Sequence, residues 1–178
     1  MIIFMAAFIV IDGSFLALFS VIFSLWHELW HILAIKYYGK RFGLVSKTVG
    51  FSINPSMLSY RQEFFVCLAG PLSSLFLALV FLPFALKTEY LMFACFTNAA
   101  LFLINVIPIY PLDGGRILYA YLCERLTLDS ANKISKCVTH IFLLPLLILS
   151  VIIFIRTGYN LSLLMITIYL LVLGVKNI

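Results

Sequence analysis

Three ionisable residues lie within five positions of one apolar segment. The segment reads His27-Glu28-Leu29-Trp30-His31, with two imidazoles four residues apart and a carboxylate directly after the first. Residues four apart share one face of a helix, so His27 and His31 can bind one tetrahedral zinc ion with Glu28 beside them as general base. A charged group at the centre of a membrane helix costs about 2.5 to 3.5 kcal/mol or more. This cost favours a functional role. The alternative is a pair of buried histidines with Glu28 in an ion pair.

Two imidazoles leave a catalytic zinc site one protein ligand short, because such sites have three protein ligands and a water. Among the seven acidic residues, Asp113 is the candidate, because the other acids apart from Glu28 sit in loops, at span ends or on the opposite side. Asp113 follows a helix broken by Pro108 and Pro111. Irregular backbone at membrane depth is tolerated only where it lines protein or a water-filled cavity. A hydrolytic site needs such a cavity. Taken alone, Asp113 is better explained as an N-cap for a helix beginning near Gly114, and the zinc site that lacks one ligand reverses this balance.

Asn105 is a further candidate, because a buried amide needs a hydrogen-bond partner. It can donate to a developing oxyanion or to substrate backbone, and an interhelical hydrogen bond is the alternative. His140 stands alone, and we expect it to be structural or interfacial. The four cysteines form no CxxC pair, so packing is their expected role. The predicted cofactor is one zinc ion per chain, at His27, His31 and Asp113.

The composition indicates what must position these residues. The hydrophobic fraction is 64%, the charged fraction 11% and the mean hydropathy +1.15, whereas soluble domains are about 45 to 50% apolar and about 25% charged. The sequence therefore predicts an all-α polytopic membrane protein. At roughly 20 residues per span, the 178 residues give about six transmembrane helices. We expect one membrane-embedded domain over residues 1–178, with no soluble regulatory domain.

The apolar runs give the boundaries of these spans. The first, 2–11, is short, because ten helical residues cover only about 15 Å. From Gly39 to Tyr60, apolar and polar residues roughly alternate, which predicts a small strand-like segment between spans two and three. Arg116 to Lys136 is amphipathic and partly charged. The other predicted spans are 14–38, 64–86, 90–107, 138–155 and 159–175.

Lysine and arginine are distributed unequally between the two sides of the predicted spans. Ten lie on one side, and Lys87 and Arg156 lie on the other. The positive-inside rule makes the richer side cytosolic, so both termini are expected in the cytosol. The net charge of +5 comes from these loop residues, whereas nucleic-acid binding needs a basic face on a soluble fold. No nucleic-acid partner is expected, and the first segment lacks the basic start of a cleaved signal peptide.

At these residues the chain resembles the site-2 protease family of intramembrane zinc metalloproteases, and most of all its sporulation branch, the stage IV factor FB type. The resemblance rests on His27-Glu28-Leu29-Trp30-His31, on Glu63-Phe64-Phe65 with Ala69-Gly70-Pro71-Leu72, and on the run from Asn105 to Arg116. It implies a six-span fold, zinc bound by His27, His31 and Asp113, and a site that opens towards the cytosol. Two departures are Trp30, where the family usually has glycine, and Ser73-Ser74, where it commonly has asparagine.

The resemblance also implies a function. The chain is expected to be a zinc-dependent endopeptidase that cuts a membrane-associated protein substrate by regulated intramembrane proteolysis, with a sigma-factor precursor as one such substrate. The implied setting is the bacterial cytoplasmic membrane, with the lipid bilayer and regulatory membrane proteins as partners. Two alternatives stay open, a membrane divalent-metal transporter and a catalytically inactive relative that binds membrane partners. The intact Glu28 argues against the second.

Overall fold

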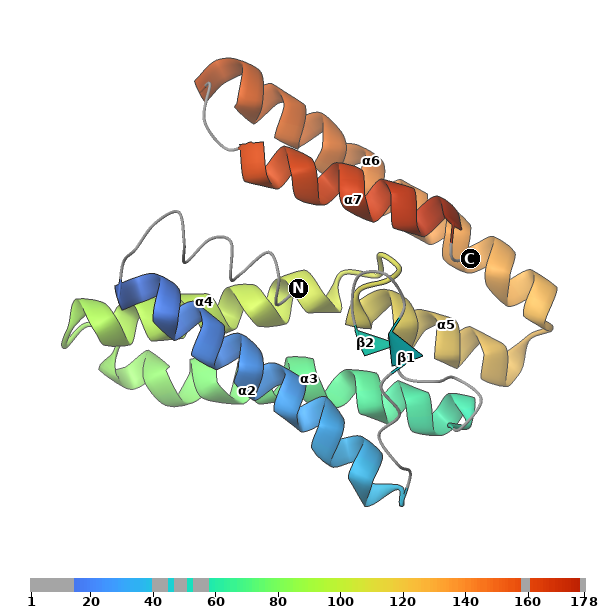
Figure 1. Ribbon diagram of the computed structural model, residues 1–178, viewed down its shortest axis with the longest axis horizontal. Coiled ribbons are helices and arrows are strands. Elements are labelled where there is room, and N and C mark those ends of the chain that lie inside the picture. Colours follow the sequence, from blue (N-terminus) through green and yellow to red (C-terminus); the bar gives the residue numbers. More distant parts are fainter. Residues whose placement is uncertain (1–14, 40–44, 47–50, 53–57, 158–160, 177–178) are drawn as a thin grey trace. The chain divides into compact units, whose positions relative to one another are not determined.

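The computed structural model describes residues 15–39, 45–46, 51–52, 58–157 and 161–176, most of which are helical (Figure 1). The chain divides into two compact units, Met1–Ile104 and Asn105–Ile178. The elements are α2 (Phe15–Tyr37), β1 (Val45–Ser46), β2 (Phe51–Ser52), α3 (Tyr60–Phe81), the 3-10 helix η2 (Leu82–Phe84), α4 (Glu89–Val106), α5 (Asp113–Arg125), α6 (Leu128–Thr157) and α7 (Leu161–Lys176).

Three stretches of helix in the described part of the chain are long and apolar enough to cross a membrane. They are Tyr60–Phe84, Glu89–Val106 and Leu128–Arg156. They agree with the predicted helical membrane protein, and their bounds lie close to the predicted spans 64–86 and 90–107. The predicted first span, 2–11, lies outside the described residues, so the number of six spans stays a prediction.

The start of α3 is set by local hydrogen bonds. Ser59 is the N-cap, and its hydroxyl accepts from the Gln62 amide at 3.3 Å while the Gln62 side chain accepts from the Ser59 amide at 3.0 Å. This reciprocal capping box satisfies two amides that the first helical turn leaves unpaired. The helix therefore begins at Tyr60, four residues before the predicted span, with Glu63 in its first turn.

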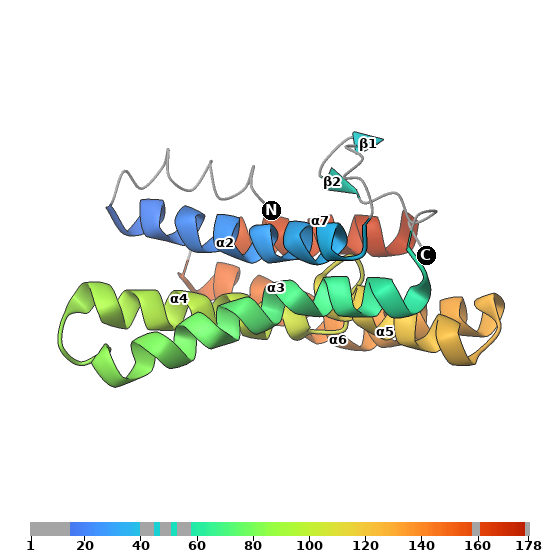
Figure 2. The same ribbon diagram turned by 90° about the horizontal axis from the view of Figure 1, so that it is seen from below.

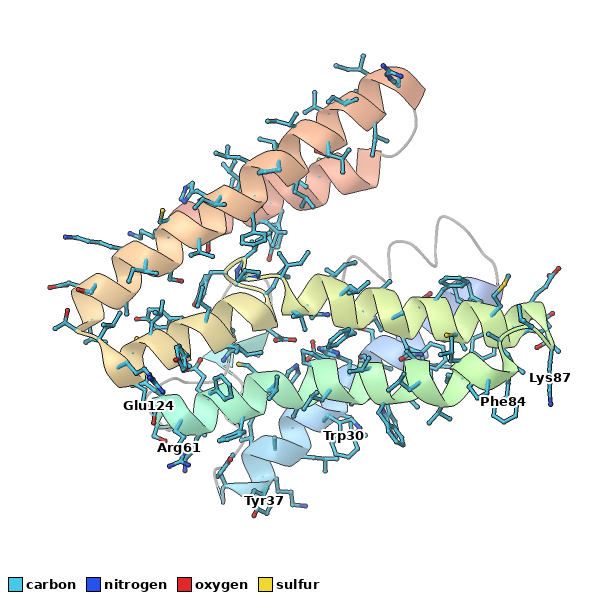
Figure 3. All side chains as sticks on the ribbon, turned by 180° about the vertical axis from the view of Figure 1, so that it is seen from behind. Trp30, Tyr37, Arg61, Phe84, Lys87 and Glu124 are labelled. Atoms are coloured by element: carbon cyan, nitrogen blue, oxygen red, sulfur yellow. The ribbon has the colours of Figure 1, made fainter. Side chains whose placement is uncertain are left out.

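In the first unit, α2 packs on α3, and α3 returns through η2 into α4 (Figure 2). The two helices of this hairpin also meet where the Cys95 thiol lies 3.4 Å from the Ala78 carbonyl. A small apolar core of Phe23, Ala94 and Leu101 joins α2 to α4. At the tip of the hairpin, the Lys87 ammonium lies 5.0 Å from the centre of the Phe84 ring (Figure 3).

In the second unit, α6 packs against both α5 and α7. Its apolar core is Ile109, Leu143 and Leu170, and the Ser150 and Thr167 hydroxyls lie 3.1 Å apart between α6 and α7. The helix α6 has 30 residues, or about 45 Å at about 1.5 Å per residue. It begins ten residues before the predicted span 138–155, so the predicted amphipathic segment 116–136 is divided between α5 and the first turns of α6.

The described part of the predicted strand-like segment is short. Val45–Ser46 pairs antiparallel with Phe51–Ser52, with Val45 opposite Ser52 and Ser46 opposite Phe51. Most of the segment from Gly39 to Tyr60 lies outside the described residues, so its extent as a strand-like segment stays a prediction.

Candidate metal centre

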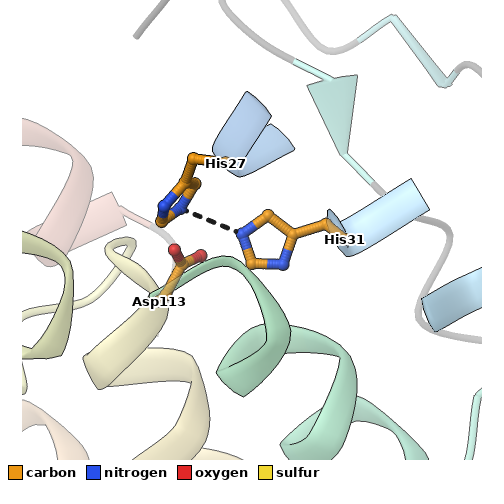
Figure 4. Close-up of side chains that lie close together, drawn as sticks. All are labelled: His27, His31 and Asp113. Carbon is orange, nitrogen blue, oxygen red and sulfur yellow. Dashed lines mark hydrogen bonds between the residues drawn. The ribbon is translucent and has the colours of Figure 1, made fainter. Parts of the chain in front are cut away.

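The two histidines of the first motif meet inside the first unit. His27 and His31 are one turn apart on α2 and are 1% and 8% exposed. Their rings point at one another, with the two Nε2 atoms 3.2 Å apart (Figure 4). The predicted pairing of the imidazoles on one helix face is therefore present in the structure.

Three residues of α3 form the surface on which these rings rest. The Nδ1 atom of His31 lies 2.7 Å from the Val66 carbonyl, and the Nδ1 atom of His27 lies 2.9 Å from the Ser74 hydroxyl. Between them is Gly70, where a Cβ would overlap Nε2 of His31 and lie 2.6 Å from Nε2 of His27. Val66, Gly70 and Ser74 follow at intervals of four residues, so they form one row on α3 against the row of His27 and His31 on α2.

These contacts define the tautomer of His31. A carbonyl oxygen can only accept a hydrogen bond, so Nδ1 of His31 is the protonated nitrogen, and Nε2 of the neutral ring carries a lone pair. A metal-binding histidine characteristically donates its other ring N–H in this way to a carbonyl or carboxylate. The lone pair on Nε2 of His31 faces the Nε2 atom of His27, so a proton or a cation is needed between these two nitrogens.

The separation of the two nitrogens fits a zinc site. Zinc–nitrogen bonds of about 2.0 to 2.1 Å at a tetrahedral angle place two ligand nitrogens about 3.3 Å apart. The observed distance is 3.2 Å, and a Cβ on Gly70 would occupy the space beside both nitrogens. The residues present therefore fit a metal ion bound through both Nε2 atoms.

Glu28 and Trp30 lie on opposite flanks of the histidine row, since successive residues of a helix are about 100° apart. Glu28 is half-buried. Trp30 is 39% exposed and stacks edge-on against Trp26 with ring centres 6.0 Å apart (Figure 3). The tryptophan at the usual glycine position therefore does not lie on the flank that carries the candidate base.

Asp113 and Asn105 belong to the second unit. Asp113 is half-buried and is the first residue of α5, whose N-cap is Leu112. The alternative interpretation of Asp113 as the N-cap is therefore wrong, because the backbone becomes helical one residue earlier than that interpretation requires. Asn105 is 4% exposed and is the penultimate residue of α4.

The segment between α4 and α5 is irregular, as its prolines predict. A Cβ on Gly114 would overlap the Val106 carbonyl, which shows how closely α5 begins against the end of α4. In the same segment the Tyr110 amide donates to the Thr139 hydroxyl at 3.2 Å, and the Tyr110–Pro111 bond is cis. Glycine at position 114 therefore permits the close approach of the start of α5, at Asp113, to the end of α4.

Sequence reasoning missed the contacts that Val66, Gly70 and Ser74 make with the histidines. It used Ala69-Gly70-Pro71-Leu72 only as part of the family resemblance and Ser73-Ser74 only as a departure from the family pattern. The spacing of four residues from a glycine to a serine was a usable signal, because it places both on one helix face. A backbone carbonyl such as that of Val66 carries no sequence signal.

Comparisons with known proteins agree with this fold and motif. The model of the Peptidase M50B-like family matches residues 1–113, and that of Peptidase family M50 matches residues 85–149. Stage IV sporulation protein FB of Bacillus subtilis is 32% identical over 79 residues, which cover 42% of this chain and 27% of that protein. The chain thus aligns with only about a quarter of the length of that relative.

A solved structure has the same fold. The Site-2 Protease from Methanocaldococcus jannaschii superposes with a TM-score of 0.67 at 22% identity, over 97% of this chain and 83% of that one. The M50B-like match covers well over half of the chain, so the chain belongs to the M50 peptidases, the site-2 protease family. Within this family it is related to the stage IV sporulation protein FB type. It is an integral membrane protein of a metalloprotease family, so a bound metal ion is expected.

Proposed function

We propose that this chain is a zinc-dependent intramembrane endopeptidase that hydrolyses a peptide bond of a membrane-associated protein. The observation that carries the proposal is the buried pair of His27 and His31, with Nε2 atoms 3.2 Å apart over Gly70, on a helix that also bears Glu28. Burying imidazoles is costly unless their ring nitrogens are satisfied, and here each Nδ1 atom contacts a group of α3 while the two Nε2 atoms face each other.

Asp113 completes the proposed ligand set, which Figure 4 draws. Each of the three residues offers one ligand atom, an imidazole nitrogen from each histidine and a carboxylate oxygen from Asp113. Two imidazoles and one carboxylate are the ligands of several catalytic zinc sites, which leave the fourth position open. Because this set of donor atoms includes two nitrogens, we propose zinc and not a metal that prefers oxygen ligands alone.

Glu28 is the proposed general base. A bound zinc ion supplies Lewis acidity that polarises the scissile carbonyl and makes a water acidic. The Glu28 carboxylate takes a proton from the attacking water and then delivers it to the nitrogen of the leaving amine. The Val66 carbonyl and the Ser74 hydroxyl hold the imidazoles in place throughout. Asn105 is proposed to donate its amide N–H to substrate backbone or to the developing oxyanion.

The substrate is proposed to be a membrane-spanning or membrane-associated segment that unwinds locally. A helix in lipid keeps its peptide groups hydrogen-bonded, so a scissile bond becomes open to attack only after unwinding. The segment containing β1 and β2 is proposed to bind the unwound stretch by adding a strand. A sigma-factor precursor is the proposed substrate class, supported by the similarity to a stage IV sporulation protein.

The setting that we propose follows from charge and length. Six spans, with both termini on the cytosolic side of a bacterial cytoplasmic membrane, agree with the ten lysines and arginines on that side against two on the other. Regulatory membrane proteins are the further proposed partners. One membrane-embedded domain over residues 1–178 also remains part of the proposal.

The test compares the wild type with Glu28→Gln. Cleavage is measured with co-expressed single-span substrates, and zinc per chain is measured on the purified proteins. We expect Glu28→Gln to lower cleavage by about 10²- to 10⁴-fold, the typical contribution of a general base, while zinc per chain stays at the wild-type value. Glu124→Gln is the matched control, because Glu124 is an exposed glutamate near the end of α5. Equal product from the wild type and Glu28→Gln would refute the assignment of the base. Zinc uptake by proteoliposomes without cleavage would favour a transporter.

A further inference from the structure

The two candidate metal-binding histidines are held by different kinds of group. The partner of His31 is the main-chain carbonyl of Val66, whereas the partner of His27 is the side-chain hydroxyl of Ser74. Both contacts lie inside the first unit. Val66 and Ser74 are each 0% exposed, so bulk water does not compete for either imidazole at these positions.

This difference has a chemical consequence for the tautomer of each ring. The Val66 carbonyl accepts only, so it admits a single neutral tautomer of His31, with the proton on Nδ1. The Ser74 hydroxyl can donate or accept, so His27 has the right tautomer for ligation through Nε2 only when Ser74 accepts from Nδ1–H. The tautomer of His27 is therefore coupled to the direction of its hydrogen bond with Ser74 on α3.

We propose that Ser74 is a positioning residue of the metal centre, which accepts a hydrogen bond from Nδ1–H of His27 and so keeps Nε2 available as a ligand. This inference rests on the proposed zinc function and concerns how that site is built. Ser74 does not touch the metal or the substrate. It acts through His27, as groups hydrogen-bonded to metal ligands characteristically do.

The geometry of α3 explains why a serine suits this position. Gly70 lies one turn before Ser74 and has no Cβ, which lets both imidazoles approach the α3 backbone. At such a short distance between helices, a hydroxyl one bond from Cβ reaches Nδ1 of His27 at 2.9 Å. Ser73, the neighbouring serine, instead donates its hydroxyl to the Gly70 carbonyl at 2.7 Å.

The test measures zinc affinity in the detergent-solubilised full chain, by competition with a chromophoric chelator. We expect Ser74→Ala to weaken zinc binding by about 10- to 100-fold, the usual effect of removing a group that orients a metal ligand. We expect Ser74→Thr to keep most of the zinc affinity, because threonine also carries its hydroxyl on Cβ. Ser73→Ala is the matched control and should bind zinc as the wild type does.

A second readout reports the ligand geometry directly. With Co²⁺ in place of zinc, the wild type should show the intense visible absorption of a four-coordinate site, and Ser74→Ala should show a weaker or shifted band. Wild-type zinc affinity in Ser74→Ala with an unchanged cobalt spectrum would overturn the positioning role while leaving the proposed function intact. An equal loss in Ser73→Ala would also overturn it. A wild type that binds no metal would overturn the proposed function itself.

Discussion

Asp113 is the residue on which the proposed ligand set depends most, because one helix alone supplies only two of the three ligands. It begins α5 directly after an irregular segment, and Gly114 lets that start lie close to the end of α4. Leu112 occupies the N-cap position without a side-chain hydrogen bond, and Asp113 is the acidic residue of the first turn. Asp113 is therefore not the N-cap, and its ligand role is the proposal that needs a test.

Asp113→Asn should lower bound zinc to well below one ion per chain, because a neutral amide is a poorer ligand for zinc than a carboxylate. The measurement is metal content by mass spectrometry after gel filtration in detergent. Asp129→Asn, an exposed acidic residue in the first turn of α6, is the control and should keep its zinc. Undiminished metal in Asp113→Asn would point to a different third ligand.

At the scale of elements, the fit between α2 and α3 determines the histidine pair. The row of Val66, Gly70 and Ser74 on α3 and the pair on α2 both repeat every four residues, and hydrogen bonds join them at both ends. A side chain at position 70 would separate the rows. The histidine pair is thus a property of two packed helices, and the motif on α2 does not set its geometry alone.

Gly70→Ala should abolish zinc binding while leaving α3 helical. Alanine is favoured over glycine in a helix by about 1 kcal/mol, so helix propensity by itself predicts a gain in stability. The new Cβ would nevertheless overlap Nε2 of His31. Zinc content and circular dichroism separate the two effects. Ala69→Ser adds one heavy atom at the preceding position and should retain zinc. Full zinc occupancy in Gly70→Ala would contradict the packing described for the two helices.

Much of this arrangement could be predicted from the sequence. The pair His27 and His31 follows from helical spacing, and the break between α4 and α5 follows from Pro108 and Pro111. The start of α6 could not be predicted as reliably, because the turn before Leu128 is marked mainly by Thr127, whose hydroxyl bonds Ser130 at 3.0 Å. The partners of the histidines were missed because contacts between helices depend on tertiary packing, which single-sequence periodicity does not describe.

At the scale of the whole molecule, the distribution of charge predicts which way the chain faces. The amphipathic first turns of α6 carry Lys133 and Lys136 next to the exposed Cys137, whereas Lys87 lies at the tip of the α3–α4 hairpin. The positive-inside rule assigns these two regions to opposite sides of the membrane. Native cysteines offer a direct way to examine this assignment.

Cys137 should react with a membrane-impermeant maleimide only from the cytosolic side, in inverted vesicles. A cysteine introduced by Lys87→Cys should react only in right-side-out vesicles. Cys137 is read by gel shift in a Cys123→Ser background, and Lys87→Cys in a background with both Cys123→Ser and Cys137→Ser. The buried Cys67 and Cys95 should stay unlabelled until the protein is denatured. Labelling of Cys137 from outside the cell would reverse the proposed orientation.

The contrast between the Val66 carbonyl and the Ser74 hydroxyl has a consequence for variation among relatives. Every residue type has a carbonyl, so no single codon change deletes the group that holds His31, provided α3 keeps its path. A single codon change can delete the group that holds His27. Lineages that lose cleavage while keeping a binding role would therefore be expected to accumulate substitutions at position 74 sooner than at position 66.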